Sequence, residues 1–137
     1  MKELTKTFLI DDHIYTGKNK KRRVSLNLNI YRNLHFQVSN SAKVNFLKKL
    51  LFDYPEIENI IAERVEISYA ILKRNNRSFD TMNIISIADK FFLDALVSVG
   101  CIKDDNYKVV SYGSISVIEE LQKKENQIYI FCRFYIK

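Results

Sequence analysis

The sequence predicts an α+β fold, in which a mixed four-stranded sheet and two main helices form a single small domain. Its 137 residues suit one domain with one core, because domains of this size are among the commonest. Hydrophobic residues make up 47% of the chain, and 8 Tyr and 9 Phe are among them, which is enough to fill such a core. Strand-like and helix-like patterns also alternate along the chain. We therefore expect residues 1–137 to form one domain, in the order strand, long loop, helix, strand, helix, strand, strand.

The first forty residues are predicted to contain one short strand and a long polar loop. Lys6–Ile10 has the apolar composition of a strand, whereas Asp11–Asn40 has no sustained period. A loop of this length in a compact domain is usually functional or disordered. The aromatic residues spaced along it argue against disorder.

A helix is predicted from Ser41, because the residues that follow place an apolar stripe at helical spacing. Asn40 or Ser41 is expected to cap this helix. Pro55 is expected to end it, with a short helical turn near Ile57–Ala62. The stripe consists of Val44, Phe46, Leu47, Leu50 and Leu51.

The second half of the chain is predicted to hold three strands and the clearest helix. Apolar and polar residues alternate over Val65–Ile71, which indicates a half-buried strand. Asp80–Val99 carries a broad apolar face and should end at Gly100. Strands are then expected over Tyr107–Ile118 and Ile128–Ile136, and the turn between them predicts a hairpin.

The composition argues against several classes of protein. No stretch reaches the ~18 apolar residues that a membrane-spanning helix needs, and Met1–Lys6 lacks the apolar region of a secretory signal. Cys101 and Cys132 are too few and too far apart for a zinc site or a disulfide framework. We expect a cytoplasmic protein in which both cysteines are reduced thiols.

The positive charge of the chain gives the first functional indication. The net charge is +6, from 22 Lys+Arg against 16 Asp+Glu, and the pI is near 9.3. Such a protein is attracted to phosphate backbones or to anionic membranes. A solvated basic loop is the alternative interpretation of these charges. The candidate DNA-binding residues are Lys18, Lys20, Lys21, Arg22, Arg23, Arg32, Lys73, Arg74 and Arg77.

Acidic residues flank and interrupt the second main helix. Asp80 precedes it, Asp89 lies about two turns in, and Asp104 and Asp105 follow it. Converging carboxylates are able to hold Mg²⁺, which polarises a phosphate oxygen and activates a water molecule. An acidic centre with basic loops around it is what a metal-dependent nuclease requires.

Each acidic residue also has a purely structural interpretation. Asp80 is a favoured residue for a helix N-cap, and Asp89 is able to pair with a nearby lysine. Lys90 and Asp94 have the spacing of a helix-surface ion pair. Asp104, Asp105 and Asn106 are common turn formers.

Four other features of the sequence bear on its chemistry. His13 follows two aspartates, as in a metal site, but is expected to lie in a loop. His35 is either a loop anchor or a substrate contact. Cys101 is expected to be a core thiol, and Phe91–Phe92 to belong to the core or a dimer surface.

A run of about 28 residues combines these acidic positions with a specific set of neighbours. The matching residues are Asp80-Thr-Met-Asn83, Ser86, Asp89-Lys90-Phe91-Phe92, Asp94-Ala95-Leu96-Val97, Gly100 and Asp104-Asp105-Asn106-Tyr107. This run resembles the RusA family, the Holliday-junction resolvases of bacteriophages and prophages. The upstream Ser25-Leu26-Asn27, Tyr31-Arg32-Asn33 and His35 are also similar to phage-type members.

The resemblance implies a homodimeric, Mg²⁺-dependent endonuclease that nicks two strands symmetrically at a four-way DNA junction during recombination and repair. Asp80 matches the first metal-binding aspartate of the family, and Asp105, with Asp104 beside it, matches the aspartate after the helix. Lys90 matches the helix lysine, which would stabilise charge that develops on the phosphate. Asn83 matches the asparagine after the first acidic pair, and Asn83 and Gly100 are expected to have structural roles.

The chain departs from the family pattern Asp-x-Asp-Asn at Met82, which cannot bind Mg²⁺. We hypothesise that Asp89 supplies the missing carboxylate, so that Asp80, Asp89 and Asp105 act together on the metal. The alternative function is a non-catalytic phage protein that recognises branched or single-stranded DNA. A dimeric interaction protein with surplus surface lysine is a third interpretation.

Overall fold

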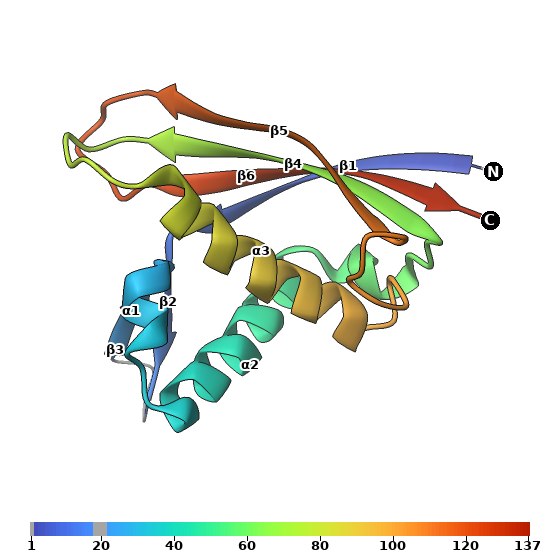
Figure 1. Ribbon diagram of the computed structural model, residues 1–137, viewed down its shortest axis with the longest axis horizontal. Coiled ribbons are helices and arrows are strands. Elements are labelled where there is room, and N and C mark those ends of the chain that lie inside the picture. Colours follow the sequence, from blue (N-terminus) through green and yellow to red (C-terminus); the bar gives the residue numbers. More distant parts are fainter. Residues whose placement is uncertain (1, 18–21) are drawn as a thin grey trace.

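The computed structural model describes residues 2–17 and 22–137 and has an α+β fold, as predicted (Figure 1). Its main sheet has four strands in the order β1-β6-β4-β5. β6 is antiparallel to both β1 and β4, whereas β5 is parallel to β4. The strands are β1 (Lys2–Asp11), β4 (Arg64–Lys73), β5 (Val110–Glu119) and β6 (Gln127–Ile136).

The helices lie together on one face of this sheet (Figure 1). The two main helices are α2 (Phe36–Asp53) and α3 (Thr81–Ser98), as the sequence predicts. The remaining elements are α1 (Leu28–Arg32), a short 3-10 helix η2 (Pro55–Asn59), and a two-stranded ribbon of β2 (His13–Thr16) and β3 (Arg22–Ser25). None of the helices in the described ranges is long and apolar enough to cross a membrane.

The core lies between the sheet and α3. Nine of the residues in α3 are buried, among them Phe91 and Phe92, so the predicted core role of this pair is confirmed. Phe92 packs against Phe8 of β1, with 5.3 Å between the ring centroids. The thiol of Cys101 is buried as expected, and burial raises its pKa to about 12, which makes it a poor nucleophile.

The prediction of a long loop over Asp11–Asn40 is wrong for most of that segment. β1 extends over ten residues rather than five, and the ribbon, α1 and the first turn of α2 occupy much of Asp11–Asn40. Short elements of four or five residues give no sustained hydrophobic period, so a pattern search misses them. His13 accordingly begins β2 instead of lying in a loop.

The predicted C-terminal hairpin is also wrong. β5 and β6 are consecutive in the chain but are not neighbours, because β6 lies between β1 and β4. The alternate residues Ile128, Ile130, Cys132 and Phe134 of β6 are buried. Hydrophobic alternation identifies a strand but does not identify its neighbours, so the sequence alone could not place β6.

The helix ends confirm two of the predicted caps and correct a third. The Asp80 side chain accepts a hydrogen bond from the Met82 backbone N–H at 3.1 Å, and Gly100 follows α3 with a φ of +78°. For α2, His35 is the N-cap and accepts from the Gln37 N–H at 3.2 Å. The helix therefore begins before Asn40, and His35 has an anchoring role.

Gly113 of β5 lies where the strand crosses very close to β4. A Cβ atom at this position would lie 2.3 Å from the Ser68 hydroxyl oxygen, which accepts a hydrogen bond from the Ser114 N–H at 3.0 Å. We expect Gly113→Ala to reduce the free energy of unfolding by about 1–3 kcal/mol, because the neighbours must move. Urea denaturation measures this loss.

A second substitution, Ser68→Ala, tests whether the Ser68 hydroxyl group is the cause of this loss. If the clash is with the hydroxyl group, Gly113→Ala should cost less in the Ser68→Ala background than in the wild type. An equal cost in both backgrounds would contradict this explanation.

Candidate functional site

The carboxylate of Asp89 lies at the centre of the candidate site. Asp89 projects from α3 toward the sheet, where it accepts short hydrogen bonds from the Tyr69 hydroxyl of β4 and the Tyr112 hydroxyl of β5. Tyr69 is buried and Tyr112 is half exposed. One carboxylate therefore joins a helix to two strands, and one of its two partners faces solvent.

The surroundings of Asp89 disfavour its ionised form. Burial is the largest effect and raises the pKa of Asp89, and the Asp105 charge raises it further. The two tyrosine hydrogen bonds act in the opposite direction and lower it. Within the described part of the chain, no lysine or arginine forms an ion pair with Asp89, although a half-buried carboxylate normally has such a partner.

Asp105 lies in the exposed turn that leads from α3 toward β5. The Asp104 carboxylate accepts hydrogen bonds from the Asp105 N–H at 2.7 Å and from the Asn106 amide at 2.9 Å. These bonds lower the pKa of Asp104. The predicted turn is thus present, and the Asp105 charge raises the pKa of Asp89. Among the described residues, however, Asp80, Asp89, Asp104 and Asp105 do not gather within metal-ligand distance of one another.

Asp80 is not brought to this pair within one chain. It caps the start of α3, and nine residues of helix separate it from Asp89, which corresponds to about 14 Å along the helix axis. Lys90 and Met82 are exposed and Asn83 is half-buried on the same helix. The predicted Lys90–Asp94 pair is replaced by an ion pair between Asp94 and Lys43 of α2, at 3.6 Å.

Those predicted basic residues that the structure describes are distributed around the end of the molecule where α3 begins. Arg23 of β3 contacts the β5–β6 loop through Glu125, at 2.7 Å. The same loop contacts the β4–α3 loop, since the Arg74 N–H donates to Asn126 at 2.8 Å. Lys73 donates to the Asn75 carbonyl at 2.7 Å, and Arg22, Arg32 and Arg77 are exposed. Lys18, Lys20 and Lys21 lie outside the described residues.

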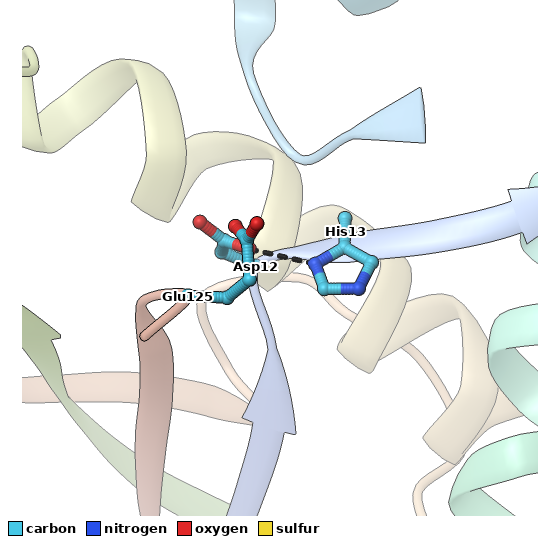
Figure 2. A group of neighbouring side chains, drawn as sticks. All are labelled: Asp12, His13 and Glu125. Carbon is cyan, nitrogen blue, oxygen red and sulfur yellow. Dashed lines mark hydrogen bonds and ion pairs between the residues drawn. The ribbon is translucent and has the colours of Figure 1, made fainter. Parts of the chain in front are cut away.

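A second cluster joins Asp12, His13 and Glu125 (Figure 2). Their ligand atoms all lie within 4.8 Å of one another. The His13 Nδ1 atom lies 2.8 Å from an oxygen of the Asp12 carboxylate, which is hydrogen-bonding distance. The Arg23 guanidinium lies 3.4 Å from His13 and 3.6 Å from Asp12. Because an arginine already occupies this cluster, we interpret it as an ion-pair network that fastens the β2–β3 ribbon to the β5–β6 loop.

The sequence did not identify Tyr69, Tyr112 or Glu125 as site residues. Tyr69 fits the apolar alternation of a buried strand, so its composition gave no other signal. Tyr112 reaches Asp89 only because β5 is parallel to β4, and Glu125 lies 112 residues from His13 along the chain. Such contacts depend on the strand order, which the sequence did not reveal.

Comparison with known proteins gives distant similarity to solved structures. No protein-family model and no curated protein sequence matches the chain. Among solved structures, E. coli HypE, a hydrogenase maturation protein, aligns with 98% of this chain and 31% of that chain, at 10% identity and a TM-score of 0.39. A HypE–HypF complex aligns with 98% and 33%, at 11% identity and a TM-score of 0.40. The chain thus spans about a third of these proteins, and a similarity at this level supports no statement about function.

The hydrogen bond from Tyr112 gives a test of the electrostatics around Asp89. Because this bond lowers the pKa of Asp89, Tyr112→Phe should raise that pKa further. Carboxyl NMR titration of Asp89 measures the change without relying on activity. The matched control is Tyr107→Phe, since Tyr107 is 84% exposed. An unchanged or lower pKa in the Tyr112 variant would contradict the structure.

Proposed function

We propose that this protein is a Mg²⁺-dependent, structure-selective DNA endonuclease that resolves four-way or related branched junctions by paired symmetric nicks. We further propose that it is a cytoplasmic homodimer in a bacterial host, and that it belongs with the phage and prophage RusA resolvases. The resemblance of the Asp80–Tyr107 run supports this proposal, together with the basic residues at the start of α3.

The observation that carries the proposal is the Asp89 carboxylate, which projects from α3 and accepts hydrogen bonds from the Tyr69 and Tyr112 hydroxyls. Asp89 is half-buried, the Asp105 charge raises its pKa, and neither carboxylate forms an ion pair with a cationic side chain among the described residues. This arrangement costs free energy in the absence of a counter-charge. A divalent cation with oxygen ligands would neutralise it.

Asp89 and Asp105 carry the oxygen ligands that Mg²⁺ prefers, and Asp104 precedes Asp105 in the same turn. When bound, the metal supplies charge that polarises a phosphate oxygen and activates water. Asp80 completes the predicted set, but α3 holds it at the far end of the same subunit. Lys90 is exposed on the next position of α3, where it is free to approach a phosphate.

The basic run of residues 18–23 and the described basic residues around the start of α3 are proposed to bind backbone phosphates. Replacing Lys20, Lys21 and Arg22 of this run by Gln should weaken junction binding and make it less dependent on salt. Each lost phosphate contact reduces the slope of log K against log [salt] by about 0.9. The slope should therefore fall by up to about 3, as measured by fluorescence anisotropy over a range of salt concentrations.

The matched control for this variant removes three positive charges elsewhere. Lys2, Arg64 and Lys137 are replaced by Gln, since the strand registers pair Lys2 with Ile136 and Arg64 with Tyr135, at the end of the sheet that carries both termini (Figure 1). This control should change binding much less. Equal losses in the two triple variants would show a dependence on net charge alone and would contradict the proposed interface.

The second candidate function is a binding protein that recognises branched or single-stranded DNA without cutting it. Two observations favour it: Met82 replaces a carboxylate of the family pattern, and Asp80 lies apart from Asp89. Tight junction binding without cleavage would support this candidate.

The experiment that separates the two functions is cleavage of an end-labelled four-way junction beside a linear duplex of the same sequence. The endonuclease should nick the junction alone in Mg²⁺, and EDTA or Asp105→Asn should abolish the nicks. Binding that is unaffected by EDTA and produces no nick would reject the enzyme.

A further inference from the structure

Two exposed aromatic side chains line a groove between the β2–β3 ribbon and α2. The ribbon extends away from the main sheet and lies beside the helices (Figure 1). The groove has a volume of about 380 Å³. Phe52 and Tyr15, which line it, are 85% and 45% exposed, and large apolar side chains that gather at a hollow mark a binding surface. None of the acidic candidate residues lines this groove, so it is separate from the site around Asp89.

One side of α2 forms a wall of the groove. Asn45, Lys48, Lys49 and Phe52 follow the spacing i, i+3, i+4 and i+7, so they lie on the same side of the helix. A different side of α2 is buried in the core. The Asn45 side-chain amide donates a hydrogen bond to the Tyr15 carbonyl at 2.9 Å. This bond ties the ribbon to the helix and fixes the two walls relative to each other.

The Tyr15 ring is held in position by the ion-pair network described above. It contacts the His13 ring edge to face, with 5.3 Å between the ring centroids. His13 is hydrogen-bonded to Asp12 at 2.8 Å, and Arg23 connects this network to Glu125. One aromatic wall of the groove is therefore ordered before any ligand arrives, which reduces the entropy cost of binding.

The groove carries an unbalanced positive charge. Lys49 is paired with Asp53 at 2.9 Å, whereas Lys48 is exposed and forms no ion pair with the described residues. Asn45 and Phe52 are about 10 Å apart along the helix axis, and Lys48 lies between them, about one turn from each. A cationic group thus lies between the two aromatic ends of the groove.

We propose that this groove binds a short single-stranded segment of DNA, with one unpaired base stacked on Tyr15, another on Phe52, and the phosphate backbone beside Lys48. Aromatic rings combined with basic side chains bind single strands without sequence preference, because every base has a flat face and every nucleotide a phosphate. In a duplex, the neighbouring base pairs cover those faces. The choice of DNA rests on the proposed function, since branched DNA supplies unpaired bases, and it adds a second DNA site to that function.

The position of the bases is tested with a fluorescent reporter. The chain contains no tryptophan, so Phe52→Trp places a single indole in the groove. Oligodeoxythymidylate of about ten nucleotides, added in EDTA, should quench this indole because a base stacks on it. The control is Ile61→Trp, since Ile61 is 74% exposed and lies outside the groove. Equal quenching of the two reporters, or no quenching of either, would overturn the proposal.

Substitutions separate base stacking from simple apolar contact. Phe52→Ala and Tyr15→Ala should each weaken binding of the labelled oligonucleotide by about 5- to 150-fold, which is the range for losing one base–aromatic stack. Fluorescence anisotropy measures this loss. Phe52→Leu should bind as weakly as Phe52→Ala, because leucine is apolar but has no aromatic face, whereas Phe52→Tyr should retain binding. Wild-type affinity in Phe52→Leu would show an apolar docking surface instead and would overturn the proposal.

The position of the backbone is tested by salt dependence. Lys48→Gln should reduce the slope of log K against log [salt] by about 0.7, which is the effect of losing one phosphate contact to a single strand. Lys137→Gln, at the other end of the molecule, should leave the slope unchanged, and equal reductions in the two variants would contradict the place given to the backbone. Tighter binding of oligouridylate than of oligodeoxythymidylate would overturn the choice of DNA.

These measurements use neither Mg²⁺ nor cleavage, so they fail separately from the proposed function. A wild type that binds the oligonucleotide through Phe52 but does not nick a junction would refute the endonuclease and support the groove. A wild type that nicks junctions but does not bind the oligonucleotide would refute the groove alone.

Discussion

Asp89→Asn is expected to reduce Mg²⁺-dependent junction cleavage by at least about a hundredfold, which is the scale of losing one well-placed electrostatic group. Asn keeps the shape of the side chain and an oxygen that is able to accept a hydrogen bond from Tyr69 or Tyr112. It removes the charge that would balance the metal. Initial rates of nicking on an end-labelled junction measure the effect.

The same substitution is not expected to destabilise the metal-free protein. The pKa of Asp89 is raised in the folded state, so its ionised form costs stability above that pKa, and the cost disappears as the pH falls through it. Asn removes this cost, so the Tm of Asp89→Asn in EDTA should equal or exceed that of the wild type at neutral pH. If Asp89→Asn has lost junction cleavage but keeps this Tm, unfolding of the variant is excluded as the cause.

Asp94→Asn is the matched control on the same helix. Asp94 is part of an exposed ion pair with Lys43, and such pairs contribute little to stability. Its cleavage rate should stay close to that of the wild type. Full activity of Asp89→Asn, or equal losses in the two variants, would contradict the role given to Asp89.

Phe92→Ala is expected to have the largest effect on stability, about 3–5 kcal/mol. Phe92 is fully buried and joins α3 to β1 through its contact with Phe8. Alanine would leave a cavity between the helix and the sheet, at the element that carries Asp80 and Asp89. Chemical denaturation in urea measures the change in the free energy of unfolding.

Phe52→Ala is the control for this prediction, because the Phe52 side chain is 85% exposed although it is equally large. A change in the free energy of unfolding within about 0.5 kcal/mol is expected there. Similar losses in the two variants would contradict the placement of the core.

The long periodic elements were predictable from the sequence. α3 shows its apolar face over five turns, begins at a favoured capping residue and ends at Gly100, so its bounds were found almost to the residue. β4 was predictable for the same reason, since its alternating residues Val65, Ile67, Tyr69 and Ile71 are buried. Local propensity and tertiary burial agree in these elements.

The strand order was not predictable, and the candidate site depends on it. β6 lies between β1 and β4, and this insertion leaves β5 as a parallel edge strand beside β4. Only this arrangement brings Tyr112 to Asp89. The acidic residues themselves are identified by their types and spacing, but the straight course of α3 separates Asp80 from Asp89 by about 14 Å.

The central claim is that the protein cuts branched DNA at paired positions. The most direct test labels each of the four strands of a junction in turn and maps the nicks in Mg²⁺ at nucleotide resolution. Nicks at symmetric positions on one pair of opposing strands, absent from the linear duplex and from the Asp89→Asn protein, are the predicted result. No nicks at all, or cuts equally frequent in the linear duplex, would contradict the account.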